Sequence, residues 1–142
     1  MNWKRILLGG LAAGLLMVVI DSIVGLTLLM PRYQARQMDG TFLKDPQLPF
    51  APLWILGFFA IGVVLAWLYA VARPRLGPGP KTALTVGLAV GLLAQVPYPF
   101  AFASWSPAGR FIPLLWMLSG LAEYLLASLL AGFLYREEEQ RA

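Results

Sequence analysis

Two acidic residues lie inside long apolar stretches of the chain, and they are the residues best suited to do chemistry. Asp21 lies in the apolar stretch 6–30, and Glu123 lies near the middle of the apolar stretch 111–135. A carboxylate deep in a bilayer costs roughly 2.5–3.5 kcal/mol on insertion scales, so such a residue is a candidate functional site. No Lys or Arg lies in either stretch to neutralise the acids. The sequence therefore predicts that at least one of them carries a proton at neutral pH.

Helical spacing brings three further polar side chains toward the two acids. Asp21 shares a helix face with Gly14, Gln95 and Tyr98 share one with Gly91, and Ser119 shares one with Glu123. The depths of the acids differ by only ~5 Å at a rise of ~1.5 Å per residue. We therefore expect one intramembrane polar cluster, formed by Asp21, Gln95, Tyr98, Ser119 and Glu123. Two interpretations stay open: a proton-exchanging site, or a static hydrogen bond between helices.

Pro97 and Pro99 interrupt the third apolar stretch beside this cluster. Each proline lacks a donor and clashes with the carbonyl four residues earlier, which frees the carbonyls of Leu93 and Gln95. In lipid a freed carbonyl must be met by a side chain, water or a ligand. The helix break is either part of a binding site or a kink that leads into the next loop.

The elements that must position these residues are four apolar helices. The chain has 142 residues, of which 59% are hydrophobic and 13% charged, against about 45–50% and 25% in soluble domains. It is predicted to be all-α, a single transmembrane domain over 1–142 that forms a four-helix bundle. The expected helices are approximately 6–30, 50–71, 83–105 and 111–135. Residues 32–38 could form a short interfacial helix, and the proline- and glycine-rich segment 72–82 is expected to be a non-helical corner.

The chain contains no cysteine and no histidine. Their absence excludes disulfides, thiol redox chemistry, thiolate metal sites and His-ligated haem. No nucleophile, metal ligand or phosphate loop accompanies the two acids. The sequence therefore predicts no catalytic residue, no metal site, no cofactor and no enzymatic activity, and its scattered basic residues do not predict nucleic-acid binding.

Basic residues predict the orientation in the membrane, because cytoplasmic loops are enriched in Lys and Arg. Seven basic residues fall on the side of the termini, and four on the other side, so both termini are expected in the cytoplasm. The seven are Lys4, Arg5, Arg73, Arg75, Lys81, Arg136 and Arg141, and the four are Arg32, Arg36, Lys44 and Arg110. Three of the seven, Arg73, Arg75 and Lys81, could bind anionic lipid headgroups, or could serve only as the topology signal. Aromatic residues near the ends of the stretches are interpreted as an interfacial belt, among them Trp54 and Trp116.

Two glycine pairs, Gly10/Gly14 and Gly87/Gly91, have the spacing that lets helix backbones approach closely. We expect them to pack within the chain. The runs Gly-Leu-Ala-x-Gly-Leu-Leu around the two pairs align at an offset of 77 residues. This alignment favours two parallel-repeat helical hairpins, with chance similarity of membrane helices as the alternative.

The corner Arg-Pro-Arg-Leu-Gly-Pro-Gly-Pro-Lys-Thr-Ala at 73–83 follows a Trp-Leu-Tyr helix end, and the chain starts with Lys-Arg-Ile-Leu at 4–7. In these features the chain resembles small bacterial four-helix inner-membrane proteins of unassigned function. The resemblance covers the whole chain and implies a multi-pass protein of the bacterial inner membrane. It implies nothing about activity, because the shared motifs are loop residues.

Two functions are weighed from the sequence. The favoured one is an accessory or structural subunit that packs against a larger membrane complex, because the chain is small and has no catalytic motif. Its helices would then present a flat outward face rich in Gly or Ala. The alternative is a small proton-linked transporter, expected to be a homodimer, in which Asp21 and Glu123 exchange a proton. An intramembrane enzyme acting on lipid ranks third.

Overall fold

The computed structural model describes residues 1–135, which form helices and connecting segments without a strand. The elements are α1 (Trp3–Val24), the π-helical segment η1 (Gly25–Leu29), α2 (Met30–Met38), α3 (Phe50–Leu76), α4 (Pro80–Gln95), α5 (Pro97–Trp105) and α6 (Phe111–Leu134). They build four spans long and apolar enough to cross a membrane, Trp3–Met38, Phe50–Leu76, Pro80–Trp105 and Phe111–Leu134. The prediction of an all-α, multi-pass membrane bundle is confirmed.

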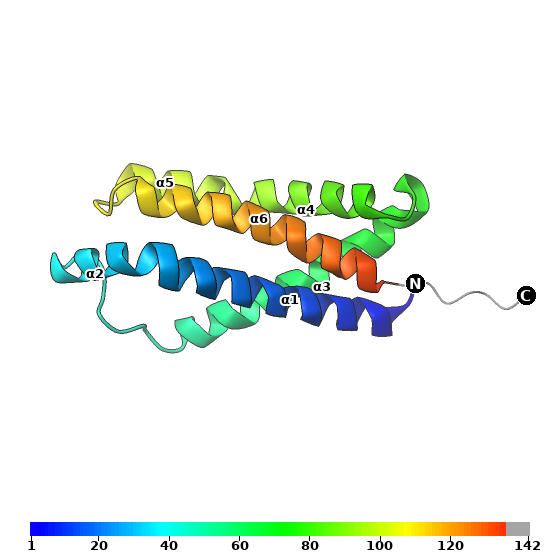
Figure 1. The fold of residues 1–142 in the computed structure, drawn as a ribbon, viewed down its shortest axis with the longest axis horizontal. Coiled ribbons are helices and arrows are strands. Elements are labelled where there is room, and N and C mark those ends of the chain that lie inside the picture. The colour runs from blue at the N-terminus through cyan, green and yellow to red at the C-terminus, as the bar shows by residue number, and fades with distance from the viewer. Residues whose placement is uncertain (136–142) are drawn as a thin grey trace, which may run out of the picture.

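The spans run roughly antiparallel, so the connections gather at two ends (Figure 1). One end, here called the N-terminal end, holds the N-terminus, the α3–α4 corner and the end of α6. The opposite end, here called the far end, holds α2, the segment 39–49 and the α5–α6 loop. In Figure 1 α1 and α6 lie close together near the N-terminal end and separate toward the far end.

Close helix packing holds the N-terminal half together. α1 packs against α3 and α6, and α6 also packs against α4. The core at these contacts includes Ile6, Ala13, Met17 and Leu65, all without exposed surface. Lipid supplies no hydrophobic drive between helices, so such contact depends on close van der Waals packing of small residues.

The four glycines of the two predicted pairs lie at helix contacts within the chain. A Cβ on Gly10 would stand 2.5 Å from the Cα of Val63 in α3, and one on Gly14 would stand 2.6 Å from the Cα of Phe59. In the second hairpin, a Cβ on Gly87 would stand 2.8 Å from the Tyr124 carbonyl oxygen of α6, and one on Gly91 would stand 3.2 Å from the Tyr124 Cβ. Each pair thus lets the first helix of a hairpin approach the second.

The hairpins are nevertheless not packed symmetrically against each other. A two-fold arrangement would make the α1–α6 contact equal to the α3–α4 contact. The α1–α6 contact is much the more extensive of the two. The glycine packing matches the repeat hypothesis and the unequal contacts do not, so the repeat stays a hypothesis.

The helix ends differ from the sequence prediction at the corner 72–82. The expectation of a non-helical corner is wrong for 72–76, where α3 continues through Pro74, and for 80–82, which begin α4. Pro74 lies within the last turn, where its missing N–H leaves the Ala70 carbonyl without its helical partner, and Gly77 with φ of +85° ends the helix. Pro80 stands in the first turn of α4, where proline is favoured because its missing N–H has no intrahelical partner.

Basic residues sit at both ends of the bundle. Arg73 at the N-terminal end lies with its guanidinium carbon 5.7 Å from the ring centre of Tyr135, while Arg75 and Lys81 are exposed. Arg136 and Arg141, which contributed to the predicted orientation, lie outside the described residues. Which end faces the cytoplasm stays a prediction.

Candidate functional site

A cavity of about 660 Å³ lies between the spans, with walls that include Asp21 of α1 and Glu123 of α6. Every span contributes to its wall. All five residues of the predicted polar cluster line it: Asp21, Gln95, Tyr98, Ser119 and Glu123. The structure therefore brings together side chains that are as many as 102 positions apart in the chain, and their functional role is a prediction.

Glu123 of α6 is the most buried of the five, with 2% of its surface exposed. None of the residues in the described part of the chain donates a hydrogen bond to its carboxylate or pairs with it. No fully buried side-chain polar atom within 1–135 lacks a partner. The Glu123 oxygens therefore face the open space of the cavity.

Asp21 of α1 is half-buried and lines the same cavity as Glu123. It too has no hydrogen-bond or ion-pair partner among residues 1–135. No Lys or Arg is found among the described residues that line the cavity. The site therefore holds two carboxyl groups whose negative charge no protein cation offsets.

The π-helical segment η1 turns the first span so that it keeps facing the cavity. Asp21, Gly25, Leu29 and Tyr33 all line the wall, at spacings of four residues. In a regular α-helix twelve residues would rotate Tyr33 by roughly 120° away from Asp21. A π-helix closes i→i+5 bonds and makes wider turns, which reduces this drift. π-Segments of this kind are frequent at functional sites.

Gln95 ends α4 immediately before the helix break. Its side chain hydrogen-bonds that of Tyr124, and it occupies space left free by Gly120, where a Cβ would stand 2.5 Å from the Gln95 Cδ. Gly120 is thus required for the position of Gln95. Of the two prolines, the buried Pro99 lines the cavity and Pro97 does not. The break at Val96 therefore borders the site at Tyr98 and Pro99 and does not itself form its floor.

Aromatic side chains make up the part of the wall nearest the far end. The Trp116 indole N–H donates a 2.6 Å hydrogen bond to the Tyr33 hydroxyl. Phe102 supports this pair, with its ring centre 5.1 Å from that of Trp116. Tyr33 and Trp116 also line a second cavity of about 500 Å³ on the far-end side. The hydrogen-bonded pair therefore lies between the two cavities.

The interpretation of Trp54 and Trp116 as members of an interfacial belt was incomplete, because both line the cavity. Trp116 could have been found from helical phase, since positions 116, 119, 120 and 123 share one face of α6. Phe58 could have been found in the same way from Trp54, four residues earlier. Tyr33 carried no such signal, because its position depends on η1.

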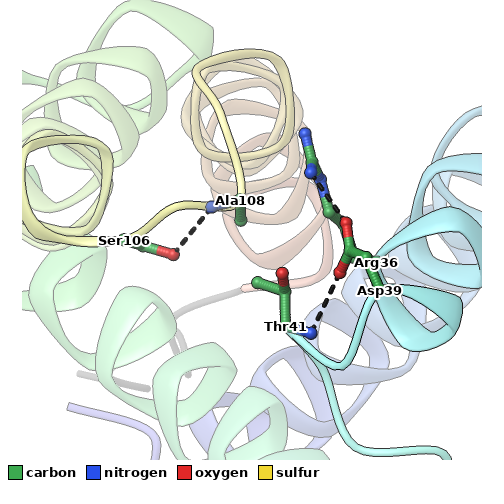
Figure 2. Close-up of polar contacts among 5 residues, drawn as sticks. All are labelled: Arg36, Asp39, Thr41, Ser106 and Ala108. Carbon is green, nitrogen blue, oxygen red and sulfur yellow. Dashed lines mark hydrogen bonds and ion pairs between the residues drawn. The ribbon is translucent and has the colours of Figure 1, made fainter.

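Hydrogen bonds fix the loops above the second cavity at the far end. Arg36 Nη1 lies 2.9 Å from Asp39 Oδ2, and the Thr41 amide donates to Asp39 Oδ1 at 3.0 Å (Figure 2). In the α5–α6 loop the Ala108 amide donates to Ser106 Oγ at 3.2 Å (Figure 2). The hydrogen bonds from the Thr41 side chain and backbone hold the pKa of Asp39 below its usual value. The end of α2 is therefore held in place by polar contacts.

Comparison of the chain with protein-family models, with curated proteins and with solved structures found no match.

Proposed function

We propose that the protein is a small proton-linked transporter whose solute site is the cavity between Asp21 and Glu123. The observation that carries this proposal is that two carboxyl groups, from α1 and α6, face one cavity and have no hydrogen-bond or ion-pair partner among residues 1–135. A proton-linked transporter requires a carboxyl group that gains and loses a proton within the membrane.

The alternative role of the acids as a static connection between helices fits the geometry less well. Such a role requires a hydrogen bond from each carboxyl group to another helix, and bilayer hydrogen bonds contribute only about 0.6 kcal/mol on average. Burying a carboxylate costs roughly 2.5–3.5 kcal/mol. Within 1–135 neither Asp21 nor Glu123 makes such a bond. The free-energy cost of burying these two carboxyl groups is thus not offset by hydrogen bonds between helices, which favours a functional role for them.

The distribution of space supports a route from the far end. The second cavity lies beyond Tyr33 and Trp116, and their 2.6 Å hydrogen bond separates it from the site. Toward the N-terminal end, Gly10 and Gly14 pack closely against α3 and Met17 is buried, while a separate cavity of about 400 Å³ lies among α3, α4 and α6 beside Tyr69 and Ala83. We assign this arrangement to a state in which the Tyr33–Trp116 pair closes the cavity on the far-end side. The glycine contacts close it on the side of the N-terminal end.

The role of accessory subunit remains the competing proposal, and the outward surface bears on it. The residues of α1 that point outward are bulky: Leu7, Leu8, Leu11 and Leu15 are all more than half exposed. This helix therefore lacks the flat Gly- or Ala-rich face expected for docking into a larger complex, and its surface suits lipid. We place the chain in the bacterial inner membrane with both termini in the cytoplasm, as the sequence predicts.

The test is electrogenic transport by the purified protein. Proteoliposomes on a solid-supported membrane would be exposed to organic cations, organic anions, amino acids and sugars in turn, with and without a pH gradient. One solute class should give a current that Asp21→Asn and Glu123→Gln abolish while circular dichroism stays unchanged. Ser104→Ala, on the exposed face of α5 and outside the walls of both cavities, is the control and should keep the current.

No current with any class, together with a stable complex with a different protein in native mass spectrometry, would refute transport and establish the accessory role. Loss of folding in both acid variants would indicate that the acids are structural.

A further inference from the structure

The chemistry of the cavity wall limits what the site can hold. Its charged groups are two carboxyl groups, and among the described lining residues none is basic. An organic anion would meet repulsion there without a compensating cation. A sugar would require many hydrogen-bond partners, but most of the wall is aromatic or aliphatic. The wall therefore favours a solute that is positively charged and largely apolar.

Glu123 supplies the strongest evidence that the cavity suits a cation. Its side chain is 98% buried, faces the cavity, and has no partner among residues 1–135. Its oxygens reach the cavity space, since no fully buried side-chain polar atom within 1–135 lacks a partner, and a mostly buried carboxyl group without a protein partner requires an explanation. A cation seated beside Glu123 and Asp21 would satisfy both acids.

The aromatic side chains identify the kind of cation. Tyr33, Phe58 and Trp116 line the wall together with the acids. A cation within about 6 Å of an aromatic ring centre is attracted by the ring, and most strongly by Trp. A small metal ion would instead need several oxygen ligands, and the described residues contain no group of three acidic, Cys or His side chains placed to hold one.

The volume of the cavity and its opening at the surface of the bundle fit a solute of drug-like size. The cavity of about 660 Å³ is in the range of ~300–1,000 Å³ that is usual for drug-sized ligands. Two of its lining residues, Tyr98 and Trp54, are 63% and 59% exposed at the surface of the bundle. The site thus reaches the lipid-facing surface, where an apolar cation would partition.

We infer that the solute of this site is a lipophilic organic cation, whose charge lies between Asp21 and Glu123 and whose apolar body contacts Trp116, Phe58 and Tyr33. This inference rests on the proposed function. Binding should displace protons from the two acids, so affinity should rise with pH. Apart from the acids, the titratable groups that line the site are Tyr33 of α2 and Tyr98 of α5. Tyr124 of α6 lies behind the wall, against Gly87 and Gly91 of α4, while α3 contributes Trp54 and Phe58 and α4 contributes Gln95.

The experiment compares tetraphenylphosphonium with tetraphenylborate, two ions of nearly the same size and shape but opposite charge. Binding to the full chain in zwitterionic nanodiscs would be measured by calorimetry at several pH values. Tetraphenylphosphonium should bind, more tightly as the pH rises, and tetraphenylborate should not. Asp21→Asn and Glu123→Gln should each weaken binding roughly ten- to a hundredfold, while Ser104→Ala, outside both cavities, should not change it.

A second measurement does not depend on removing an acid. The chain has no cysteine, so Ser119→Cys introduces a single thiol in the cavity wall. Its alkylation by a small maleimide should be slowed by tetraphenylphosphonium and not by tetraphenylborate. Equal protection by both ions, or equal binding of both ions to the native chain and the acid variants, would refute the inference. If a different solute class gave the transport current and neither ion bound, the inference would fail while the proposed function stood.

Discussion

The contact between α1 and α3 allows a sharp test of the fold, because it is made by backbone atoms. A Cβ added to Gly62 would collide with the Gly10 carbonyl oxygen and would stand 2.6 Å from the Gly14 nitrogen. An ordinary contact needs about 3.5 Å, so the Gly62→Ala change must separate the two helices by roughly 1 Å. Backbone atoms cannot rotate away, so this separation is unavoidable.

The expected cost follows from that separation. A gap of about 0.5–1 Å forfeits a quarter to a half of the dispersion attraction along the contact, and overpacking costs roughly 1–3 kcal/mol. Replacing Gly with Ala inside a helix returns about 1 kcal/mol. We therefore expect Gly62→Ala to lower the free energy of unfolding by up to about 2 kcal/mol, and by about 1–3 kcal/mol more than a Gly→Ala change that meets no neighbour. Gly57→Ala is the matched control in α3, because a Cβ there meets nothing within 4 Å, and it should be neutral or stabilising.

Reversible unfolding in mixed micelles of dodecyl maltoside and dodecyl sulfate, followed by far-ultraviolet circular dichroism, would measure both variants. If Gly62→Ala and Gly57→Ala differed by less than about 0.5 kcal/mol, the close contact of α1 with α3 would be incorrect.

Three further predictions concern the far end and the orientation. Trp116→Phe removes the N–H that Tyr33 accepts, so a Ser119→Cys thiol should react faster with a water-soluble maleimide in this background than with Trp116 present; an unchanged rate would contradict the barrier. The pKa of Asp39 is lowered in the folded protein. The ionised side chain therefore stabilises the turn at the end of α2 at a pH above its unfolded pKa of about 3.9, and this stabilisation is lost as the pH falls through the lower folded pKa. The Thr41 amide resonance should accordingly titrate with a midpoint below about 3.9, and not titrate in that range in Asp39→Asn. An impermeant maleimide added to intact cells should label Asp45→Cys and leave Pro78→Cys unlabelled; the reverse pattern would invert the predicted orientation.

Hydropathy was sufficient to predict the four spans, because a bilayer leaves helices as the only way to satisfy the backbone of such a short chain. Helical phase was sufficient to place Asp21, Gln95, Tyr98, Ser119 and Glu123 on inward faces. All five line one cavity. The periodicity of side chains along a helix was therefore sufficient to predict which of these residues lie together.

Two features could not be predicted from local pattern. The π-segment η1 has no residue signature in 25–29, and without it Tyr33 would face away from Asp21. The hydrogen bond between Trp116 and Tyr33 could therefore not be predicted from the sequence. Continuation of α3 through Pro74 was also missed, because the corner was interpreted from its proline and glycine content and not from where each residue falls in the last turn.

The glycine contact holds the first span against α3 near Gly14, so a small tilt of the span around this point produces a larger displacement at its far end. Beyond that point the span continues for about 19 residues to Tyr33, an arm of ~28 Å at the helical rise. A tilt of about 5° around this point would displace the Tyr33 end by ~2.5 Å, about the length of the hydrogen bond it accepts from Trp116. A tilt of this size would thus be sufficient to break the Tyr33–Trp116 hydrogen bond while the glycine contact between α1 and α3 stays in place.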